Sequence, residues 1–302
     1  MINDSSSIVR LNAVNVFTRV RHLGVVPKLI DRARLDPDVT VSVFAVRAIE
    51  FQNTDEGWEA IAQLPRLNRF GEEPLAEAAL AMGRTRNSKY RADISILVAT
   101  RYWQTRRAAA AALGMLDDES SQNTLMAFLH EIDPMVRLEA TKHANVSFAL
   151  PARRIEWGSV NDISSVVRGF SYARLILSDD PVLRSRGYAG LNPEDNDPII
   201  RTIICEAMGS DAKEHHLPIL KGMLSDVHPD VRASAVEAIF KLPGQRTFED
   251  ISILENEKYE QVLLPVFRNA KEGKIVIPRN MIERALVHRN EELRRIAGEL
   301  KR

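Results

Sequence analysis

Cysteine is almost absent from this 302-residue chain, which holds a single one, Cys205. A lone cysteine excludes an internal disulfide and is typical of a reducing compartment. No apolar run approaches the roughly 20 residues of a membrane-spanning helix. The start, Met1-Ile2-Asn3-Asp4-Ser5, lacks the basic and apolar stretches of a secretory signal. The sequence therefore predicts a cytoplasmic protein with no membrane partner.

An excess of charge of one sign is also missing, because 41 basic side chains are balanced by 41 acidic ones. A neutral chain creates no long-range field that would draw it to nucleic acid or to an anionic membrane. The balance therefore argues against nucleic acid as the main partner and leaves room only for a local basic patch.

The short motifs that indicate catalysis are absent too. The sequence has no Gly-rich phosphate loop, Gly-x-Ser-x-Gly elbow, His-Glu-x-x-His or paired-cysteine spacing. His215 and His216 would point about 100° apart on a regular helix, so even with Asp226 and His228 nearby we expect solvated histidines rather than a metal site. Cys205 has no adjacent base that would activate a thiolate, and we expect a small core residue. No catalytic residue, cofactor or metal is predicted.

What the sequence does have is one motif that recurs about every 31 residues. Its clearest copies are Asp133-Pro134-Met135-Val136-Arg137, Asp197-Pro198-Ile199-Ile200-Arg201 and His228-Pro229-Asp230-Val231-Arg232. The arginine of each copy defines a register of ten positions: Arg10, Ser42, Ala76, Arg106, Arg137, Arg168, Arg201, Arg232, Leu263 and Arg294. Seven of the ten are arginine, at steps of 30 to 34 residues, which is too regular for chance. Such a period indicates a solenoid.

Small and apolar residues accompany each register position at offsets −1, +3, +6 and +7, which share one face of a helix. The Asp-Pro pair supplies an N-cap acceptor and a proline in the first turn. We expect each register arginine to reach the cap or a carbonyl of a neighbouring repeat. A second amphipathic segment separates successive copies. The pattern predicts an all-α fold, an α-solenoid of about ten helical-hairpin repeats, in a single domain over residues 1–302.

The Asp-Pro-x-Val-Arg-x-x-Ala-x-x-Ala-Leu pattern resembles the HEAT repeat, particularly the short form of phycobilisome-lyase-like proteins. The resemblance is strong in residues 100–145 and 195–242 and weaker at Ser42, Ala76 and Leu263, where the arginine is missing. It implies a right-handed superhelix whose second helices line the concave side. Most such arrays bind macromolecules, and the motif brings no catalytic residue with it.

Positions +5 and +1 point away from the core and are the candidates for a recognition surface. Small and basic residues occupy the first half of this series, and acidic ones appear in the second. The charged candidates are Arg47, Lys142, Glu206 and Glu237 at +5, with Arg107 at +1. We expect a partner to contact these side chains. The alternative is that they are solvated helix positions with charges placed at random.

The densest basic segment runs from Arg84 to Arg107, with seven basic residues against one acidic residue, Asp93. Its candidate contact residues are Arg84, Arg101, Trp103 and Arg107. Arginine beside tryptophan is typical of a protein-interface hot spot, and basic residues among aromatics also suit nucleic acid. In the structural alternative, Trp103 fills a wide junction between repeats.

A second candidate region surrounds Tyr172 and Arg174 and includes Arg153, Arg154 and Trp157. We expect its first helix to be short and interrupted by Gly158. An irregular repeat marks either a groove or a packing irregularity filled by large side chains. At the other end, the first helix, Ser7 to Arg19, is more apolar than an exposed end should be, which indicates either a covering partner or a longer array.

These features favour a non-enzymatic scaffold that binds a protein partner in its concave groove, within a larger assembly. Two alternatives remain. One is a lyase or lyase subunit similar to the phycobilin lyases, in which the Arg153 to Arg174 region would bind a bilin. The other is similar to the HEAT-like DNA glycosylases, but the neutral charge and the lack of a clear central aspartate speak against it.

Overall fold

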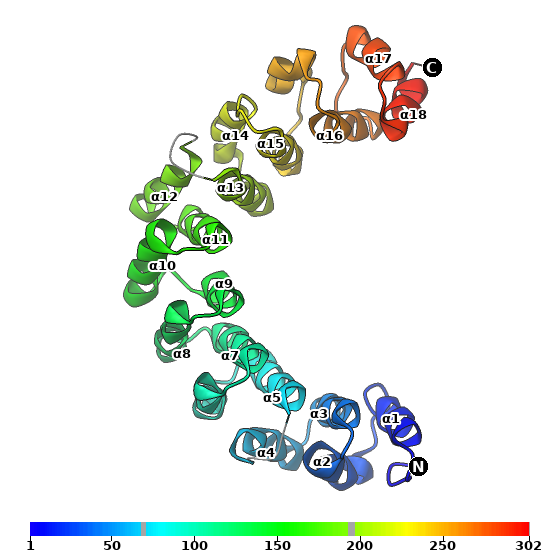
Figure 1. Cartoon of the computed structure of the whole chain (residues 1–302), viewed down its shortest axis with the longest axis vertical. Coiled ribbons are helices and arrows are strands. Elements are labelled where there is room, and N and C mark those ends of the chain that lie inside the picture. The colour runs from blue at the N-terminus through cyan, green and yellow to red at the C-terminus, as the bar shows by residue number, and fades with distance from the viewer. Residues whose placement is uncertain (68–70, 193–196, 302) are drawn as a thin grey trace. The chain divides into compact units, whose positions relative to one another are not determined.

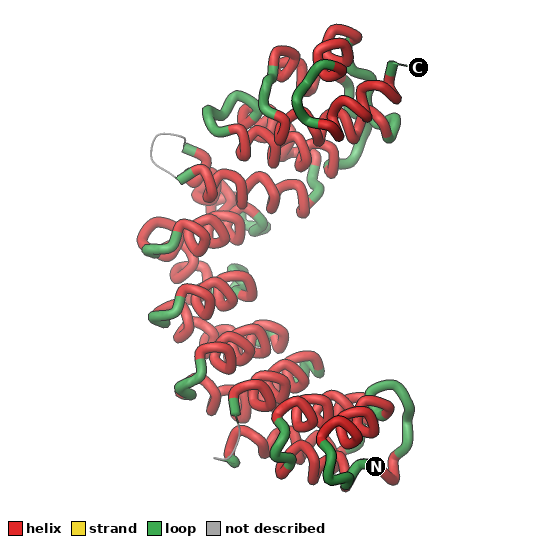
Figure 2. Tube along the Cα trace, turned by 45° about the vertical axis from the view of Figure 1, so that its right-hand side comes forward, coloured by secondary structure: helices red, strands yellow, loops and turns green. Residues whose placement is uncertain are grey.

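The computed structural model describes residues 1–67, 71–192 and 197–301, and every regular element in these ranges is a helix (Figures 1 and 2). The predicted all-α solenoid is confirmed. The chain divides into two compact units, which are Met1–Arg154 (unit 1) and Ile155–Arg302 (unit 2). The single array over residues 1–302 stays a prediction.

Unit 1 is built of two layers of helices. In the long-helix layer α1 packs on α3, α3 on α5, α5 on α7 and α7 on α9, while shorter helices cover one side of this row (Figure 1). The long helices are α1 (Ser7–Val16), α3 (Val39–Gln52), α5 (Glu72–Arg84), α7 (Trp103–Leu116) and α9 (Pro134–His143). The shorter ones are α2 (Val26–Leu35), α4 (Asp55–Gln63), α6 (Arg91–Ser95) and α8 (Glu119–Leu125).

Unit 2 repeats this plan. Its long-helix layer comprises α11 (Ser165–Ile176), α13 (Pro198–Asp211), α15 (Pro229–Lys241), α16 (Glu260–Lys271) and α18 (Glu291–Leu300), each packed on the next. The shorter elements are α12 (Pro181–Gly187), α14 (Leu217–Met223), the 3₁₀ segment η8 (Phe248–Asn256) and α17 (Arg279–Leu286). Helix α10 (Ala149–Asn161) runs for 13 residues straight through Gly158, so the predicted interruption is wrong.

The small residues of the repeat bring neighbouring long helices into close contact. A Cβ atom built on Gly83 of α5 would lie 2.6 Å from the Cα of Ala112 on α7. In unit 2 a Cβ on Gly209 of α13 would lie 2.8 Å from the Cα of Ala238 on α15. Since real Cβ contacts are longer, only glycine permits these two crossings.

The helix starts follow the Asp-Pro motif. The carboxylate of Asp133 accepts a hydrogen bond from the backbone N–H of Met135 at 2.8 Å, and that of Asp197 accepts one from Ile199 at 3.0 Å. A proline follows in the first turn of both helices. The predicted capping is confirmed for these two copies. In the third, His228 makes no side-chain cap bond.

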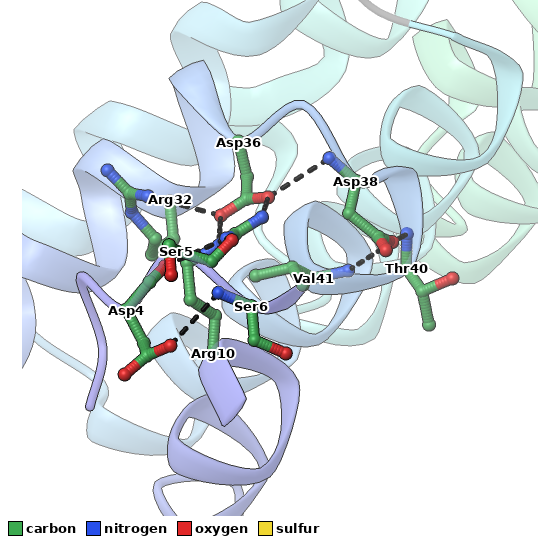
Figure 3. A network of polar contacts seen from close by, with 9 residues as sticks. All are labelled: Asp4, Ser5, Ser6, Arg10, Arg32, Asp36, Asp38, Thr40 and Val41. Atoms are coloured by element: carbon green, nitrogen blue, oxygen red, sulfur yellow. Dashed lines mark hydrogen bonds and ion pairs between the residues drawn. The ribbon is translucent and has the colours of Figure 1, made fainter. Parts of the chain in front are cut away.

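Several register arginines link their repeat to the next one through a carboxylate. Arg10 binds Asp36 at 2.8 Å, Arg201 binds Asp226 at 2.6 Å, and Arg232 binds Glu257 at 2.7 Å (Figure 3 for Arg10). The acidic residue stands 25 or 26 positions after the arginine. Arg106 and Glu131 form an equivalent ion pair at 3.1 Å. We call this series the arginine ladder.

The ladder corrects one detail of the prediction. The carboxylate is not the N-cap itself but stands two residues before it, as Asp36 does before Asp38 (Figure 3). The carbonyls that the arginines contact belong to the turn before their own helix, five and six positions back. Arg137, for example, donates to the carbonyls of Glu131 at 2.7 Å and Ile132 at 2.8 Å. One side chain therefore fixes a turn and, through the carboxylate, a neighbouring repeat.

Candidate interaction surface

The exposed face of the long-helix layer in unit 1 carries arginines and carboxylates from successive helices in alternation. Arg47 of α3 lies 2.9 Å from Glu77 of α5. Arg84 of α5 reaches back to Glu50 of α3 at 2.6 Å and also binds Glu77 at 2.9 Å. Arg107 of α7 lies 2.9 Å from Glu139 of α9. We call these residues, together with Lys142 and His143 of α9, the charged strip.

Its carboxylates are held in their charged form. Burial alone would raise the pKa of Glu77, but hydrogen bonds from Arg47 and Arg84 outweigh it and lower the pKa. A hydrogen bond from His143, assisted by Arg107, lowers the pKa of Glu139 to about 2 against the opposing effect of burial. The ion pairs of the strip therefore stay intact at neutral pH.

The charged strip differs from the prediction for the first half of the chain. The sequence suggested unopposed basic residues at Arg47, Arg84 and Arg107, whereas each is neutralised by a glutamate of an adjacent helix. The partners are Glu50, Glu77 and Glu139, which sequence reasoning missed. The signal was present, because each stands 30 to 34 residues from its arginine, about one repeat away. Lys142 is exposed in the last turn of α9, as expected.

In unit 2 the corresponding face is acidic between α13 and α15. Glu206 and Glu237 are both exposed on these two packed helices. Within the part of the chain that the structure describes, neither carboxylate forms an ion pair. Further along, Arg268 of α16 pairs with Glu292 at 2.9 Å, and Lys271 pairs with Glu299 at 2.8 Å. Glu206 and Glu237 are therefore free to meet a basic partner.

The basic segment from Arg84 to Arg107 is less positive in space than in sequence. Arg91 pairs with Asp118 at 3.1 Å, and Arg106 belongs to the arginine ladder. Arg101 donates to the hydroxyl of Tyr102 at 2.6 Å, and its guanidinium lies 4.8 Å from that ring centre. Trp103 opens α7 and is 36% exposed. Arg86 and Lys89 are exposed as well, and Lys89 Nζ lies 4.8 Å from the ring centre of Tyr90. Arg101 and Trp103 together have the composition that is typical of a protein contact.

Tyr172 and Arg174 do not form one surface. Tyr172 is only 6% exposed and belongs to the core of unit 2. A Cβ on Gly190 would lie 2.6 Å from its ring, so the ring packs flat against that glycine. The prediction that Tyr172 contacts a partner is therefore wrong. Arg174, in the last turn of α11, is partly exposed, and Trp157 of α10 is 52% exposed.

The histidine pair is arranged differently from the expectation. His215 and His216 lie on a 3₁₀ turn, Glu214–His216, rather than an α-helix, and their ring centres are 4.2 Å apart. His216 is fully buried, not solvated, and its Nε2 lies 2.8 Å from Asp211. One ligand atom each of Asp211, His215 and His216 fall within 4.8 Å of one another, whereas Asp226 binds Arg201 instead. Burial lowers the pKa of His216, so its ring is a neutral donor that fixes Asp211 at the end of α13.

Cys205 is fully buried, as predicted for a core residue. Burial raises the pKa of its thiol to about 12, so no thiolate is available for chemistry at neutral pH.

Comparison with known proteins identifies HEAT-like repeats in this chain. Residues 105–131 match the family described as PBS lyase HEAT-like repeat, and residues 216–242 match the HEAT repeat. Each match covers one helical hairpin of the array. The resemblance read from the Asp-Pro-x-Val-Arg pattern is thereby confirmed.

Solved structures similar to this chain include two that span nearly its whole length. One is an engineered protein, 13% identical, with a TM-score of 0.41 over 99% of this chain and 96% of its own. The other is human deoxyhypusine hydroxylase in complex with glycerol, 12% identical, with a TM-score of 0.34 over 98% and 96%. No curated protein sequence matches this chain. Among its described helices, none is both long and apolar enough to span a membrane.

Proposed function

We propose that this protein is a non-enzymatic scaffold that binds a protein partner along the exposed face of its long helices, the concave groove of a HEAT-like array. The observation that carries the proposal is the pair of exposed carboxylates Glu206 and Glu237 on neighbouring helices of unit 2, neither of which forms an ion pair with any other described residue. In unit 1, Arg101 and Trp103 supply exposed residues of the types that dominate protein interfaces.

The surface chemistry indicates what the partner offers. Charges across specific interfaces are complementary and set the orientation of the two proteins. Glu206 and Glu237 therefore call for lysine or arginine on the partner, whereas the neutralised arginines of the charged strip present no strong field of either sign. A protein segment with spaced basic residues fits this face. The HEAT-like repeats also favour macromolecular binding in the cytoplasm.

The experiment is affinity capture from native host extract, with residue-level cross-linking to the bait. The test variant reverses both charges, Glu206→Lys with Glu237→Lys, and the matched control is Glu249→Lys, an exposed glutamate of η8 outside the long-helix layer. We expect the captured partner to cross-link to α13 and α15 and to be lost with the double variant only. Equal capture by all three proteins would contradict the proposal.

A lyase reading is the second candidate, favoured by the match of residues 105–131 to the PBS lyase HEAT-like repeat. A lyase of this kind would have to bind a bilin, with arginines for its propionates. Titration with a bilin tests it directly, because binding shifts the visible absorbance of the pigment. An unchanged spectrum at saturating protein would dismiss this function. Duplex DNA, added at moderate salt, tests the remaining glycosylase-like alternative.

A further inference from the structure

Cavities lie at or next to the register positions without arginine. Ser42 lines a cavity of about 270 Å³, Leu75, next to Ala76, lines one of about 460 Å³, and Leu263 lines one of about 500 Å³. All residues around the Leu263 cavity lie within unit 2 and are described by the structure. Its volume falls in the range of roughly 300–1,000 Å³ that is typical of small-molecule sites.

The Leu263 cavity corresponds to an empty arginine socket. In the preceding repeat, Arg232 donates to the carbonyls of Asp226 at 2.8 Å and Val227 at 3.3 Å, six and five residues back. It also binds Glu257, 25 residues ahead. The same spacings counted from Leu263 lead to Glu257, Lys258 and His288, and all three line the cavity. Leucine is too short to occupy the space that the arginine takes in the other repeat.

The rim of this socket carries two cationic side chains, Lys258 and Arg284. His288 stands where the ladder has a carboxylate, and its Nε2 lies 3.5 Å from the carbonyl of Lys258. Its Nδ1 accepts a hydrogen bond from the backbone of Asn290 at 3.1 Å, so Nε2 carries the proton. Arg284 of α17 enters from the other side and donates to the side-chain oxygen of Asn256 at 3.2 Å and to the carbonyl of Glu255.

The nearby acids do not neutralise that rim. Both carboxylate oxygens of Glu257 are bound by Arg232, at 2.7 and 3.1 Å. Glu255 does not line the cavity, and its carboxylate accepts from Asn280 at 2.6 Å. Over the residues that the structure describes, Lys258 and Arg284 form no ion pair with a carboxylate. A guest arginine from another molecule would therefore be repelled, whereas an anion would be attracted.

Below the rim the cavity is apolar. Its floor is formed by Leu263 and Phe267 of α16 and by Met281 and Ala285 of α17. An apolar floor beneath convergent cationic donors is the usual composition of a site for a ligand with an apolar body and one charged group.

We propose that this socket binds a small amphipathic anion, with a carboxylate or similar group held by Arg284, Lys258 and His288 and an apolar body against Leu263 and Met281. The site is independent of the partner surface proposed above, since none of its residues belongs to that surface. Its origin is the loss of one ladder arginine, which leaves the space, combined with the exchange of a carboxylate for the neutral ring of His288, which removes the negative charge.

The first test uses 8-anilinonaphthalene-1-sulfonate, a fluorescent amphipathic anion, titrated into the full-length folded protein. We expect saturable fluorescence with one dominant site, displaced by decanoate but not by decyltrimethylammonium at equal concentration. Equal displacement by the cation, or no saturable binding, would overturn the proposal.

Two variants then locate the site. Arg284→Met should weaken binding of the probe about tenfold or more, since it removes a charged hydrogen-bond donor. Arg279→Met, on the same helix but outside the cavity, should leave binding unchanged. The double variant Leu263→Arg with His288→Glu should refill the socket, abolish binding and leave the melting temperature equal or higher. If Arg284→Met and Arg279→Met bind alike, or if a folded refilled variant still binds, the assignment is wrong.

Discussion

The arginine ladder and the charged strip use the same residue types for different purposes. In the ladder, Arg201 and Asp226 are 2% and 1% exposed, and they link two repeats from inside the core. In the strip, the Arg47 side chain is 47% exposed although it also crosses between repeats to Glu77. The two sets of pairs differ in sequence spacing, which is 25 or 26 residues in the ladder and 30 to 34 in the strip. They also differ in burial, which separates a pair inside the core from one that faces solvent.

The proposed partner surface of unit 2 differs from the charged strip as well. Where the strip of unit 1 satisfies its arginines with glutamates, Glu206 and Glu237 remain without such counter-charges among the described residues. Paired charges stabilise the array modestly, whereas unpaired ones do so hardly at all and remain available for binding. The predictions below compare buried ion pairs, exposed ion pairs and charges without an ion pair.

The largest effect should come from breaking a ladder pair. Arg201→Met leaves Asp226 charged and buried without its partner, which should lower the free energy of unfolding by about 3 to 5 kcal/mol. Arg47→Met, in the exposed strip, should cost about 1 kcal/mol or less. Urea denaturation followed by circular dichroism measures both. Equal losses would mean that burial does not distinguish the two sets of pairs.

A smaller effect should come from the close crossing of helices α5 and α7. Gly83→Ala would place a methyl group within 2.6 Å of the Cα of Ala112, so the helices must move apart. We expect a loss of about 1 to 3 kcal/mol in spite of the better helix propensity of alanine. Gly222→Ala in α14, where nothing lies within 4 Å, is the control and should be stabilising. A stabilised Gly83→Ala protein would disprove the tight crossing.

Much of the fold could be predicted because the repeat encodes it locally. The Asp-Pro caps at Asp133 and Asp197 and the inter-repeat role of Arg201 and Arg232 follow from residue type and spacing alone. The same register also predicts that Tyr172 is buried. It stands four residues after Arg168, at the offset of Cys205, and both residues are buried. The error came from judging the aromatic ring by its neighbours in sequence rather than by its face of the helix.

The candidate surface could be predicted only in part, because its charge depends on neighbouring helices. Offset +5 correctly marked Lys142, Glu206 and Glu237 as exposed. At the same offset Ala81, Ala111 and Ala173 are buried, so the offset alone does not define the surface. The spacing of about one repeat between Arg107 and Glu139 was an available signal, but spacing alone does not show that the two side chains meet. The burial of His216 was missed because a 3₁₀ turn replaces the expected helix.

An effect of intermediate size on stability should come from Glu139 of the charged strip, and this effect should depend on pH. The pKa of Glu139 is about 2 in the folded protein, below the value of about 4.3 for an unfolded glutamate. Its contribution is therefore full above pH ~4.3 and is lost as the pH falls toward ~2. Allowing for solvent screening of the partly exposed Arg107, Glu139→Gln should cost about 1 to 2 kcal/mol at neutral pH. Thermal melts between pH 2 and 6 should show the difference from the unmodified protein disappearing in acid. A constant difference would contradict the ion-pair assignment.

The smallest effect on stability should come from the free carboxylates. Glu206→Lys with Glu237→Lys changes exposed side chains that form no ion pair with other described residues, so the free energy of unfolding should stay within about 0.5 kcal/mol. Glu77→Lys, at a paired and largely buried position of the strip, should by contrast destabilise, because it opposes Arg47 and Arg84. Urea denaturation of the two proteins compares them directly. If the double reversal in α13 and α15 destabilised the protein as much as Glu77→Lys, these glutamates would have a structural role, and the partner surface would lose the carboxylates on which it depends.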